Sequence, residues 1–166
     1  MPDFFGTDGI RGKSPEWLTP KMAYRIGYGL GRGLNVQTLY IGRDTRSSGV
    51  ILNQALNQGA LDAGVKTFNL GVVSTPIIQY LSLKHRVYGA MITASHNPAS
   101  DNGIKILVNG SKTSLDEEII LESYLKVDTL NDLDFIPVEE IKSHIHEYLN
   151  AVASLNFPVT DINVFL

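Results

Sequence analysis

The chain has 166 residues in an ordinary globular balance, 43% hydrophobic and 19% charged, and its formal net charge of -3 offers no basic field to hold nucleic acid. It contains no cysteine, which excludes disulfides, thiolate metal sites and a cysteine nucleophile and fits a reducing compartment. The N-terminus lacks the features of a signal peptide and no stretch reaches the roughly 20 apolar residues of a membrane helix, so we expect a cytoplasmic protein without a membrane partner.

The first half of the sequence predicts alternating helices and strands. Thr19 is a candidate N-cap and Pro20 suits the first helical position, which predicts a helix over residues 19–34. Its four glycines lower its intrinsic stability but let a neighbour pack closely. Further helices are expected over residues 49–63 and from a Thr75 cap to about residue 84. The side chains expected to face inward from the second helix are Ile51, Leu52, Ala55, Leu56 and Leu61. The strands are expected at residues 38–41, 65–70 and 88–92.

A strand that turns back on the sheet is expected next. Residues 103–108 alternate in polarity, and the following Asn109-Gly110 is a strong signal for a tight turn. We therefore expect this strand to belong to a hairpin and to run antiparallel to the others. Ser114 and Glu117 have the spacing of a capping box, which predicts a helix to about residue 126.

The C-terminal part predicts one more helix and a domain boundary. A helix is expected over residues 138–155, and the apolar, strand-like residues 157–166 suggest the first strand of another domain. We accordingly assign residues 1–155 to one domain and residues 156–166 to a linker and the start of a truncated second domain. The alternation of elements predicts a three-layer α/β/α fold whose mixed, mostly parallel sheet carries one antiparallel strand.

Histidines outside the loops offer little chemistry on sequence grounds. His144 and His146 stand two positions apart on the last predicted helix, so they face different directions and are poor joint metal ligands. His85 follows the end of the third predicted helix and is interpreted as an ordinary surface residue.

One loop concentrates polar chemistry. The apolar run of residues 88–92 is typical of a buried strand, and Thr93-Ala94-Ser95-His96-Asn97-Pro98 follows it as a loop. In open α/β sheets, ligands bind in the crevice beyond the carboxyl ends of the strands. Ser95 could therefore be a nucleophile, a phosphate carrier or a turn residue, and on residue types alone the turn is the simplest interpretation.

Two other polar segments could serve the same edge of the sheet. Residues 5–12 hold three glycines around Asp8 and Arg11, and Arg11 could supply a bidentate fork for phosphate. Arg43 and Asp44 follow the strand at residues 38–41. Taken alone, residues 5–12 are more simply interpreted as a solvated loop. Arg43, Asp44 and Arg46 could be a solvated cluster of ion pairs, but their place at a strand's carboxyl end favours a supporting role in a site.

Two long strings together resemble a known family. They are Phe5-Gly6-Thr7-Asp8-Gly9-Ile10-Arg11-Gly12 and the run Gly89-Ala90-Met91-Ile92-Thr93-Ala94-Ser95-His96-Asn97-Pro98 with Asp101-Asn102-Gly103-Ile104-Lys105. The strings resemble the opening motif and the active-site signature of the α-D-phosphohexomutases, which shift phosphate between the 1- and 6-positions of hexose phosphates. They are most similar to members that interconvert glucosamine 6-phosphate and glucosamine 1-phosphate. The resemblance runs from about Phe4 to the chain's end and covers the family's first domain.

The resemblance implies a role for each matching residue. Ser95 would carry a phosphate, give it to the substrate to form a bisphosphorylated sugar, and take the other phosphate back. Lys105 would act in acid–base catalysis or charge stabilisation, Arg11 would lie beside the phosphoserine, and His96 would contact substrate or phosphate. The residues expected to bind or orient the phosphate and substrate are Thr93, Asn97, Arg43 and Asp44.

The resemblance also implies groups that this sequence does not supply. Mg²⁺ would bind through the phosphate on Ser95, while its other ligands would come from an Asp-x-Asp-x-Asp loop of a second domain, a string absent here. The expected substrate is a hexosamine phosphate, the activator and intermediate is glucosamine 1,6-bisphosphate, and the partners are the remaining mutase domains. The 166 residues alone are predicted not to turn over substrate.

Other functions remain open at this point. The chain could be the first domain of a phosphomannomutase or phosphoglucomutase, because the residues that select the sugar lie elsewhere in the family. It could be a stand-alone module that binds a phosphosugar without catalysis. It could also be an inert folding unit whose Ser95 is never modified.

Overall fold

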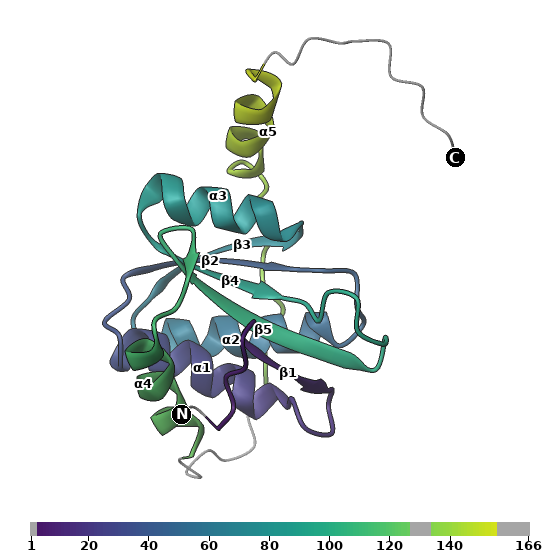
Figure 1. The fold of residues 1–166 in the computed structure, drawn as a ribbon, viewed down its shortest axis with the longest axis vertical. Helices are drawn as coiled ribbons and strands as arrows, with labels where there is room; N and C mark the ends of the chain where they lie inside the picture. Colours follow the sequence, from purple (N-terminus) through teal and green to yellow (C-terminus); the bar gives the residue numbers. More distant parts are fainter. Residues whose placement is uncertain (1–2, 127–133, 156–166) are drawn as a thin grey trace.

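A six-stranded sheet with helices on both faces makes up residues 3–126 and 134–155, the part of the chain that the computed structural model describes (Figure 1). The strands are β1 (Ile10–Lys13), β2 (Thr38–Arg43), β3 (Lys66–Val72), β4 (Tyr88–Ile92), β5 (Asp101–Val108) and β6 (Ser111–Lys112). The helices are α1 (Pro20–Arg32), α2 (Gly49–Asp62), α3 (Thr75–His85), α4 (Leu115–Leu125) and α5 (Ile145–Ala153). The linker and second-domain start expected at residues 156–166 lie outside the described residues.

The sheet has the order β1-β5-β4-β2-β3, and β6 pairs with β5. β2 is parallel to both β3 and β4, whereas β5 is antiparallel to β1, β4 and β6. Among the described strands, β5 therefore runs against the rest, as the Asn109-Gly110 turn predicts. The mixed, mostly parallel sheet with one antiparallel strand is confirmed.

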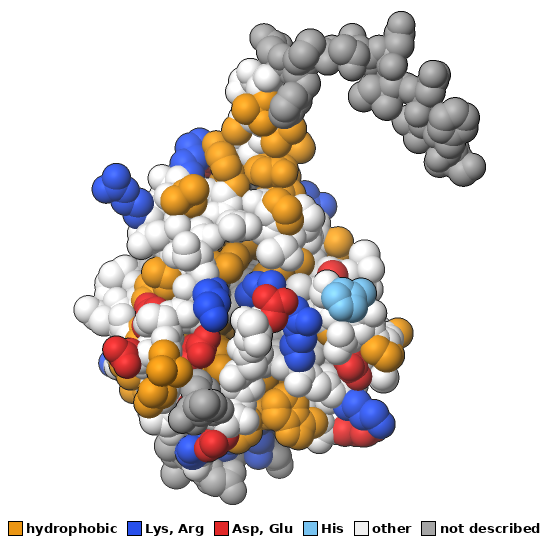
Figure 2. All heavy atoms as spheres, viewed as in Figure 1, with side chains coloured by type: hydrophobic (Ala, Val, Ile, Leu, Met, Phe, Trp, Pro, Cys, Tyr) orange, Lys and Arg blue, Asp and Glu red, His pale blue; other side chains and the backbone are white. Residues whose placement is uncertain are grey.

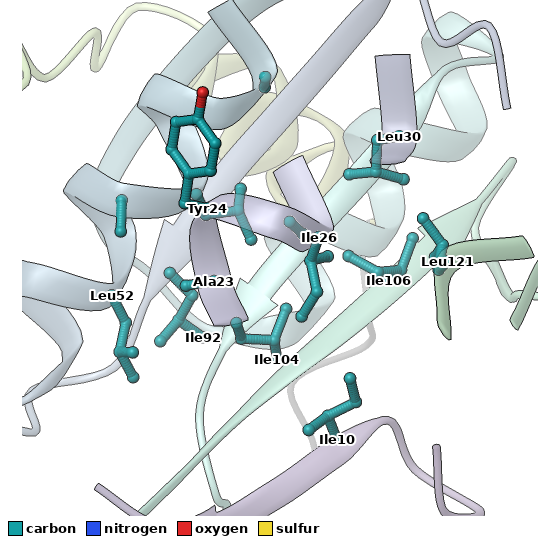
Figure 3. Close-up of a cluster of buried hydrophobic side chains, with 14 of the residues drawn as sticks. Ile10, Ala23, Tyr24, Ile26, Leu30, Leu52, Ile92, Ile104, Ile106 and Leu121 are labelled. Atoms are coloured by element: carbon teal, nitrogen blue, oxygen red, sulfur yellow. The ribbon is translucent and has the colours of Figure 1, made fainter. Parts of the chain in front are cut away.

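Each face of the sheet is covered by helices, which confirms the three layers. Figure 1 shows α1 and α2 on one face of the sheet and α3 on the other. On the first face, Ile26 of α1 and Leu52 of α2 gather against Ile92 and Ile104 of the sheet (Figure 3). Leu107 of β5 points to the opposite face and packs in the α3 cluster, as the two-residue period of a strand requires. None of the described helices is long and apolar enough to cross a membrane.

The expected close packing of the glycine-rich helix is present between α1 and α2. A Cβ added at Gly27 would overlap the carbonyl oxygen of Leu56, and one added at Gly59 would overlap the carbonyl oxygen of Tyr24. The two helix backbones therefore meet at these glycines. Any larger side chain would force the helices apart.

The helix starts follow the capping signals closely. The Thr19 hydroxyl accepts the Met22 N–H at 3.2 Å, and Ser114 and Glu117 form the expected capping box at the start of α4. The prediction of a Thr75 cap for α3 is wrong by one residue, because the N-cap is Ser74 and Thr75 is the first helical residue.

Two residues of α2 that the sequence places inward are exposed. Leu52, Ala55 and Leu56 are fully buried, whereas Ile51 and Leu61 face solvent. Leu61 follows Leu52 by about two and a half turns, which places it on the opposite side of the helix. The helical phase of each position therefore decides its burial here, and apolar character alone does not.

The last helix is shorter than expected, because α5 begins at Ile145 and the preceding residues are not helical. The Ile141 N–H donates to the Asn69 carbonyl of the edge strand β3 at 2.6 Å, and Glu140 forms an ion pair with Arg43. These partners attach Glu140 and Ile141 to the strands β2 and β3. His85 is also more than an ordinary surface residue, since its ring bonds to Glu147 of α5 at 3.1 Å.

Candidate active site

The loops that follow β2 and β4 lie at the same edge of the sheet, because these strands are parallel neighbours. The Asp44 N–H donates to the Ile92 carbonyl at 3.0 Å, and the Thr93 N–H donates to the Gly103 carbonyl at 2.9 Å. A surface hollow forms between the loops, lined by Asp44, Thr45, Arg46, Ser47, Thr93, Ser95, Asn97 and Ala99. The predicted serine loop thus occupies the carboxyl-end crevice where α/β folds bind ligands.

Ser95 is held in a strained conformation with its side chain exposed. Its φ of 57° lies in the left-handed region, which costs a non-glycine residue about 1–2 kcal/mol. The Ser95 N–H donates to the Thr93 hydroxyl at 2.9 Å, and that hydroxyl donates to the Asp44 carboxylate at 2.7 Å. The Ser95 hydroxyl lies 3.3 Å from Nδ1 of His96. The surroundings therefore fix the backbone of Ser95 while its hydroxyl faces solvent.

Arg46 is the residue that holds this loop, and the sequence motifs assign it no role. Its guanidinium donates to four loop carbonyls: those of Ser95 and Asn97 at 2.8 Å each, of Pro98 at 2.5 Å and of Asp101 at 2.9 Å. Its Nε also donates to the Asp44 carboxylate at 3.1 Å, and the side chain is 12% exposed. The planar fork of an arginine suits this task, since one group satisfies several carbonyl acceptors at once.

Asp44 and Arg43 are adjacent in sequence but act in different places. The Asp44 carboxylate bonds Thr93 and Arg46, which matches the orienting role that the resemblance implies. The Arg43 guanidinium instead lies 3.5 Å from the Glu140 carboxylate, beside the edge strand β3. Arg46 therefore bonds the serine loop directly, whereas the contacts of the Arg43 guanidinium are with Glu140 and with the Asp44 carbonyl at 3.3 Å.

Asn97 shapes the loop from within. Its side-chain amide donates to the Asp101 carboxylate at 3.1 Å, and its N–H donates to the Ala94 carbonyl at 3.1 Å. The amide is thus committed to the turn in the described structure, as is common for asparagine in tight loops.

Arg11 and Lys105 form a second group of charges through Asp8. β1 pairs antiparallel with β5, so Arg11 stands opposite Gly103, two residues before Lys105. Asp8 accepts from Lys105 at 2.9 Å and forms an ion pair with Arg11. The hydrogen bond from Lys105 holds the pKa of the Asp8 carboxyl below its ordinary value. Figure 2 shows basic and acidic side chains gathered across this face of the molecule.

Gly103 lets Arg11 approach the serine loop. A Cβ at Gly103 would lie 2.6 Å from the Thr93 carbonyl oxygen and 2.8 Å from Cγ of Arg11. Gly103 therefore leaves room for the Arg11 side chain and the Thr93 carbonyl on either side of it. The Arg11 Nε is buried and has no hydrogen-bond partner within the described part of the chain. Buried donors without a partner are rare, and a bound ion is one way to satisfy them.

The described carboxylates near Ser95 are already occupied by donors. Asp44 bonds Thr93 and Arg46, Asp101 bonds Asn97, and Asp8 bonds Lys105. A cation at this edge would therefore rest on an anion attached to Ser95 more readily than on these side chains. Within the described ranges, the arrangement is suited to receiving a phosphate group.

A comparison with protein families agrees with the fold. The family model for phosphoglucomutase/phosphomannomutase, alpha/beta/alpha domain I, matches residues 2–131. A crystal structure of a phosphoglucomutase/phosphomannomutase family protein from Burkholderia thailandensis is 30% identical, with a TM-score of 0.64 over 72% of this chain and 29% of that one. A Thermus thermophilus protein assigned as a phosphomannomutase is 29% identical, with a TM-score of 0.65 over 75% of this chain and 30% of that one.

Curated relatives are more similar in sequence. The phosphoglucosamine mutase of Natranaerobius thermophilus is 45% identical over 130 residues, which are 76% of this chain and 29% of the relative. That of Lactococcus lactis strain MG1363 is 40% identical over 158 residues, 92% of this chain and 35% of the relative. That of Prochlorococcus marinus strain AS9601 is 51% identical over 115 residues, 68% of this chain and 26% of the relative. The chain thus spans about a third or less of each relative's length.

Proposed function

Because the chain belongs to the phosphoglucomutase/phosphomannomutase family, matching its domain I over residues 2–131, we propose that it provides the phosphate-carrying serine of a phosphoglucosamine mutase. Ser95 is the proposed carrier, and a hexosamine phosphate is the proposed substrate. The sugar is inferred from the names of the relatives in sequence. The reaction is proposed for the whole assembly of domains, in the cytoplasm, and the isolated chain is expected to be inactive.

The observation that carries the proposal is the fixed, exposed Ser95. Arg46 and Thr93 hold its backbone in the left-handed region, so the Cβ that carries the hydroxyl is held at the edge of the crevice. Fixing a nucleophile in advance removes entropy that would otherwise be lost during reaction. If the loop served only as a turn, a glycine in place of Ser95 would adopt the same backbone conformation without strain.

The neighbouring side chains fit the charge changes of phosphate transfer. The Ser95 Oγ would attack phosphorus as the bond from phosphorus to the sugar oxygen breaks, and the serine proton would pass to His96 Nδ1, 3.3 Å away. His96 would then give that proton to the departing sugar oxygen, so the proton released by Ser95 is the one that the sugar takes up. Lys105 is paired with the Asp8 carboxylate, so we assign it charge stabilisation together with Arg11.

A divalent cation fits this scheme through the phosphate. Mg²⁺ would neutralise charge on the transferring group, bound here through the phosphate on Ser95, with glucosamine 1,6-bisphosphate as activator. Since Asp8, Asp44 and Asp101 are engaged by other donors, the remaining metal ligands are assigned to other domains.

A domain exchange tests the proposal. This chain would replace the matching 158 residues of the Lactococcus lactis relative, and the hybrid would be assayed with Mg²⁺ and glucosamine 1,6-bisphosphate for interconversion of the two glucosamine phosphates. We expect turnover that Ser95→Ala lowers by roughly a thousandfold or more, while Ser100→Ala, in the same exposed loop, changes it less than about twofold. Turnover that survives Ser95→Ala would refute the assignment.

A further inference from the structure

A second cluster of chemistry-bearing residues lies where α3 meets α5, away from the serine loop. His85 is the last residue of α3, His144 precedes α5, and Glu147 lies in the first turn of α5. Val87 and β4 follow His85, so the cluster lies toward the amino end of β4, whereas Ser95 follows its carboxyl end. We infer that His85, His144 and Glu147 form a binding site for a divalent transition-metal ion such as Zn²⁺, which fastens α5 to α3.

The donor set has the right chemistry for this class of ion. Two imidazole nitrogens and one carboxylate are ligands that Zn²⁺ accepts in proteins, and a fourth position can be filled by water. Because the chain has no cysteine, a site for such an ion must be built from its histidines and carboxylates. Mg²⁺, which prefers oxygen ligands, is not expected to bind here.

The spacing of the ligand atoms is close to that of a coordination sphere. Nδ1 of His144 lies 2.9 Å from Oε1 of Glu147, and Nε2 of His85 lies 3.1 Å from Oε2 of the same carboxylate. One ligand atom from each of the three residues can be chosen so that all lie within 4.8 Å of one another. Ligands at about 2.1 Å from a tetrahedral Zn²⁺ are about 3.4 Å apart. Small side-chain rotations therefore suffice to close the site.

Aromatic packing holds the two imidazoles in place. The His144 ring packs edge-on against Tyr40 at 5.3 Å and Phe68 at 4.9 Å, measured between ring centroids. The His85 ring lies 5.6 Å from Tyr40 and is almost perpendicular to that of His144. Ligands whose orientation is fixed by packing lose less freedom when an ion binds.

Lys84 competes with the ion for Glu147. Its Nζ lies 2.6 Å from the same carboxylate oxygen that bonds His85. The Lys84 side chain is 43% exposed and can turn into water when a doubly charged ion replaces it.

The site would matter for the placement of α5. No residue of α5 is fully buried, and its contacts with α3 include an edge-on pair of Tyr80 and Tyr148 with centroids 5.5 Å apart. An ion shared between His85 on α3 and Glu147 on α5 would join the two helices directly. An ion that binds the folded chain but not the unfolded chain would also raise the unfolding temperature.

Metal titration of the 166-residue chain tests the inference. Zn²⁺ would be followed by calorimetry and Co²⁺ by its d–d absorption, with the expectation of one ion per chain in a tetrahedral field. His85→Ala, His144→Ala and Glu147→Gln should each weaken binding at least about tenfold. His146→Ala is the matched control, since His146 is exposed on the same helix, and it should change affinity less than about twofold.

Lys84→Ala separates a metal site from a simple ion-pair network. If the cluster binds Zn²⁺, removing the competing ammonium should tighten binding by about threefold or more. If the cluster is only a network of ion pairs, the substitution removes one partner of Glu147 and no gain in Zn²⁺ affinity follows. Circular dichroism would show that each variant is folded. The inference is overturned if the chain binds no ion, or if binding depends on His146 or His96 and survives loss of the three proposed ligands.

Discussion

Ser95 has a left-handed backbone conformation that is unfavourable for its side chain. Its φ of 57° disfavours any side chain, so Ser95→Gly should be more stable than Ser95→Ala by about 1 kcal/mol, even though glycine loses more freedom on folding. Both variants remove the hydroxyl, so the comparison isolates the backbone. Urea unfolding of the two variants measures the difference. Equal stability, or a more stable alanine variant, would contradict the strained conformation.

Arg46 should prove more important to the loop than its sequence position suggests. Arg46→Lys places one compact ammonium where a planar fork now bonds four carbonyls, so we expect a loss of about 2 kcal/mol in the free energy of unfolding. Protease cleavage within residues 94–101 should also become faster. Arg32→Lys, a change at the end of α1, is the control and should stay within about 0.5 kcal/mol. An Arg46→Lys protein as stable and as resistant as the parent would count against the clamp.

Sequence reasoning identified the serine loop but not the residue that holds it. Ser95 and Thr93 could be selected because they stand in a string that resembles a family's active-site signature, and Asp44 because it follows a neighbouring strand. Arg46 acts on backbone carbonyls, and no pattern of residue types shows which of two neighbouring arginines will point toward them. Arg43 forms an ion pair with Glu140. The sequence did not predict that the residues around Glu140 would lie beside β3, so it could not predict this partner for Arg43.

At the contact between α1 and α2, packing outweighs intrinsic helix propensity. Alanine is intrinsically better than glycine in a helix by about 1 kcal/mol, yet Gly59→Ala should destabilise the protein by about 2 kcal/mol or more, because its Cβ would overlap the Tyr24 carbonyl. Gln58→Ala, at the preceding position, is the control and should change stability by less than about 1 kcal/mol. Thermal and urea unfolding give both values. A stabilised Gly59→Ala protein would show that the helices do not meet so closely.

Glu122 of α4 fastens the N-terminal segment to the domain. Its carboxylate, in a residue that is 4% exposed, accepts the N–H groups of Asp3, Phe4 and Phe5 at 2.8, 2.6 and 2.9 Å. Burial raises its pKa, but the three backbone donors outweigh that effect and hold the pKa below the ordinary 4.5. Glu122→Gln should cost about 2 kcal/mol at about pH 7.

The pH dependence of that cost follows from the lowered pKa. A carboxyl with a depressed folded-state pKa contributes stability that is complete above its ordinary value and is lost as the pH falls toward the folded-state value. The difference between the parent and Glu122→Gln should therefore be constant above about pH 6 and shrink below the ordinary 4.5. Urea unfolding across this range measures it. A difference that grows on acidification would contradict the account.

Elements with local signals were predicted best. The strand at residues 88–92 and the starts of α1 and α4 follow from apolar runs and caps that neighbouring residues determine. The helix predicted over residues 138–155 is wrong for residues 138–144, where the Ile141 N–H bonds the carbonyl of Asn69, far away in sequence. Long-range partners of this kind leave no local periodicity in the sequence.

The molecule as a whole has one pronounced asymmetry. The residues of the proposed phosphate site lie toward the carboxyl end of β4; they are Ser95, Arg46, Arg11 and Lys105. The residues of the inferred metal site lie toward the amino end of β4; they are His85, His144 and Glu147. Each site is built from elements brought together by the sheet. The division suggests separate roles, chemistry at one edge and attachment of α5 at the other.

Locating the phosphoryl group tests the central claim most directly. In the hybrid with the Lactococcus lactis relative, purified in Mg²⁺ and treated with glucosamine 1,6-bisphosphate, the intact mass and its fragments would be measured. The account predicts one added group of about 80 Da on Ser95, absent from Ser95→Ala. A phosphoryl group on Ser47, Ser48 or Ser74 instead, or turnover by a hybrid whose Ser95 stays unmodified, would contradict it.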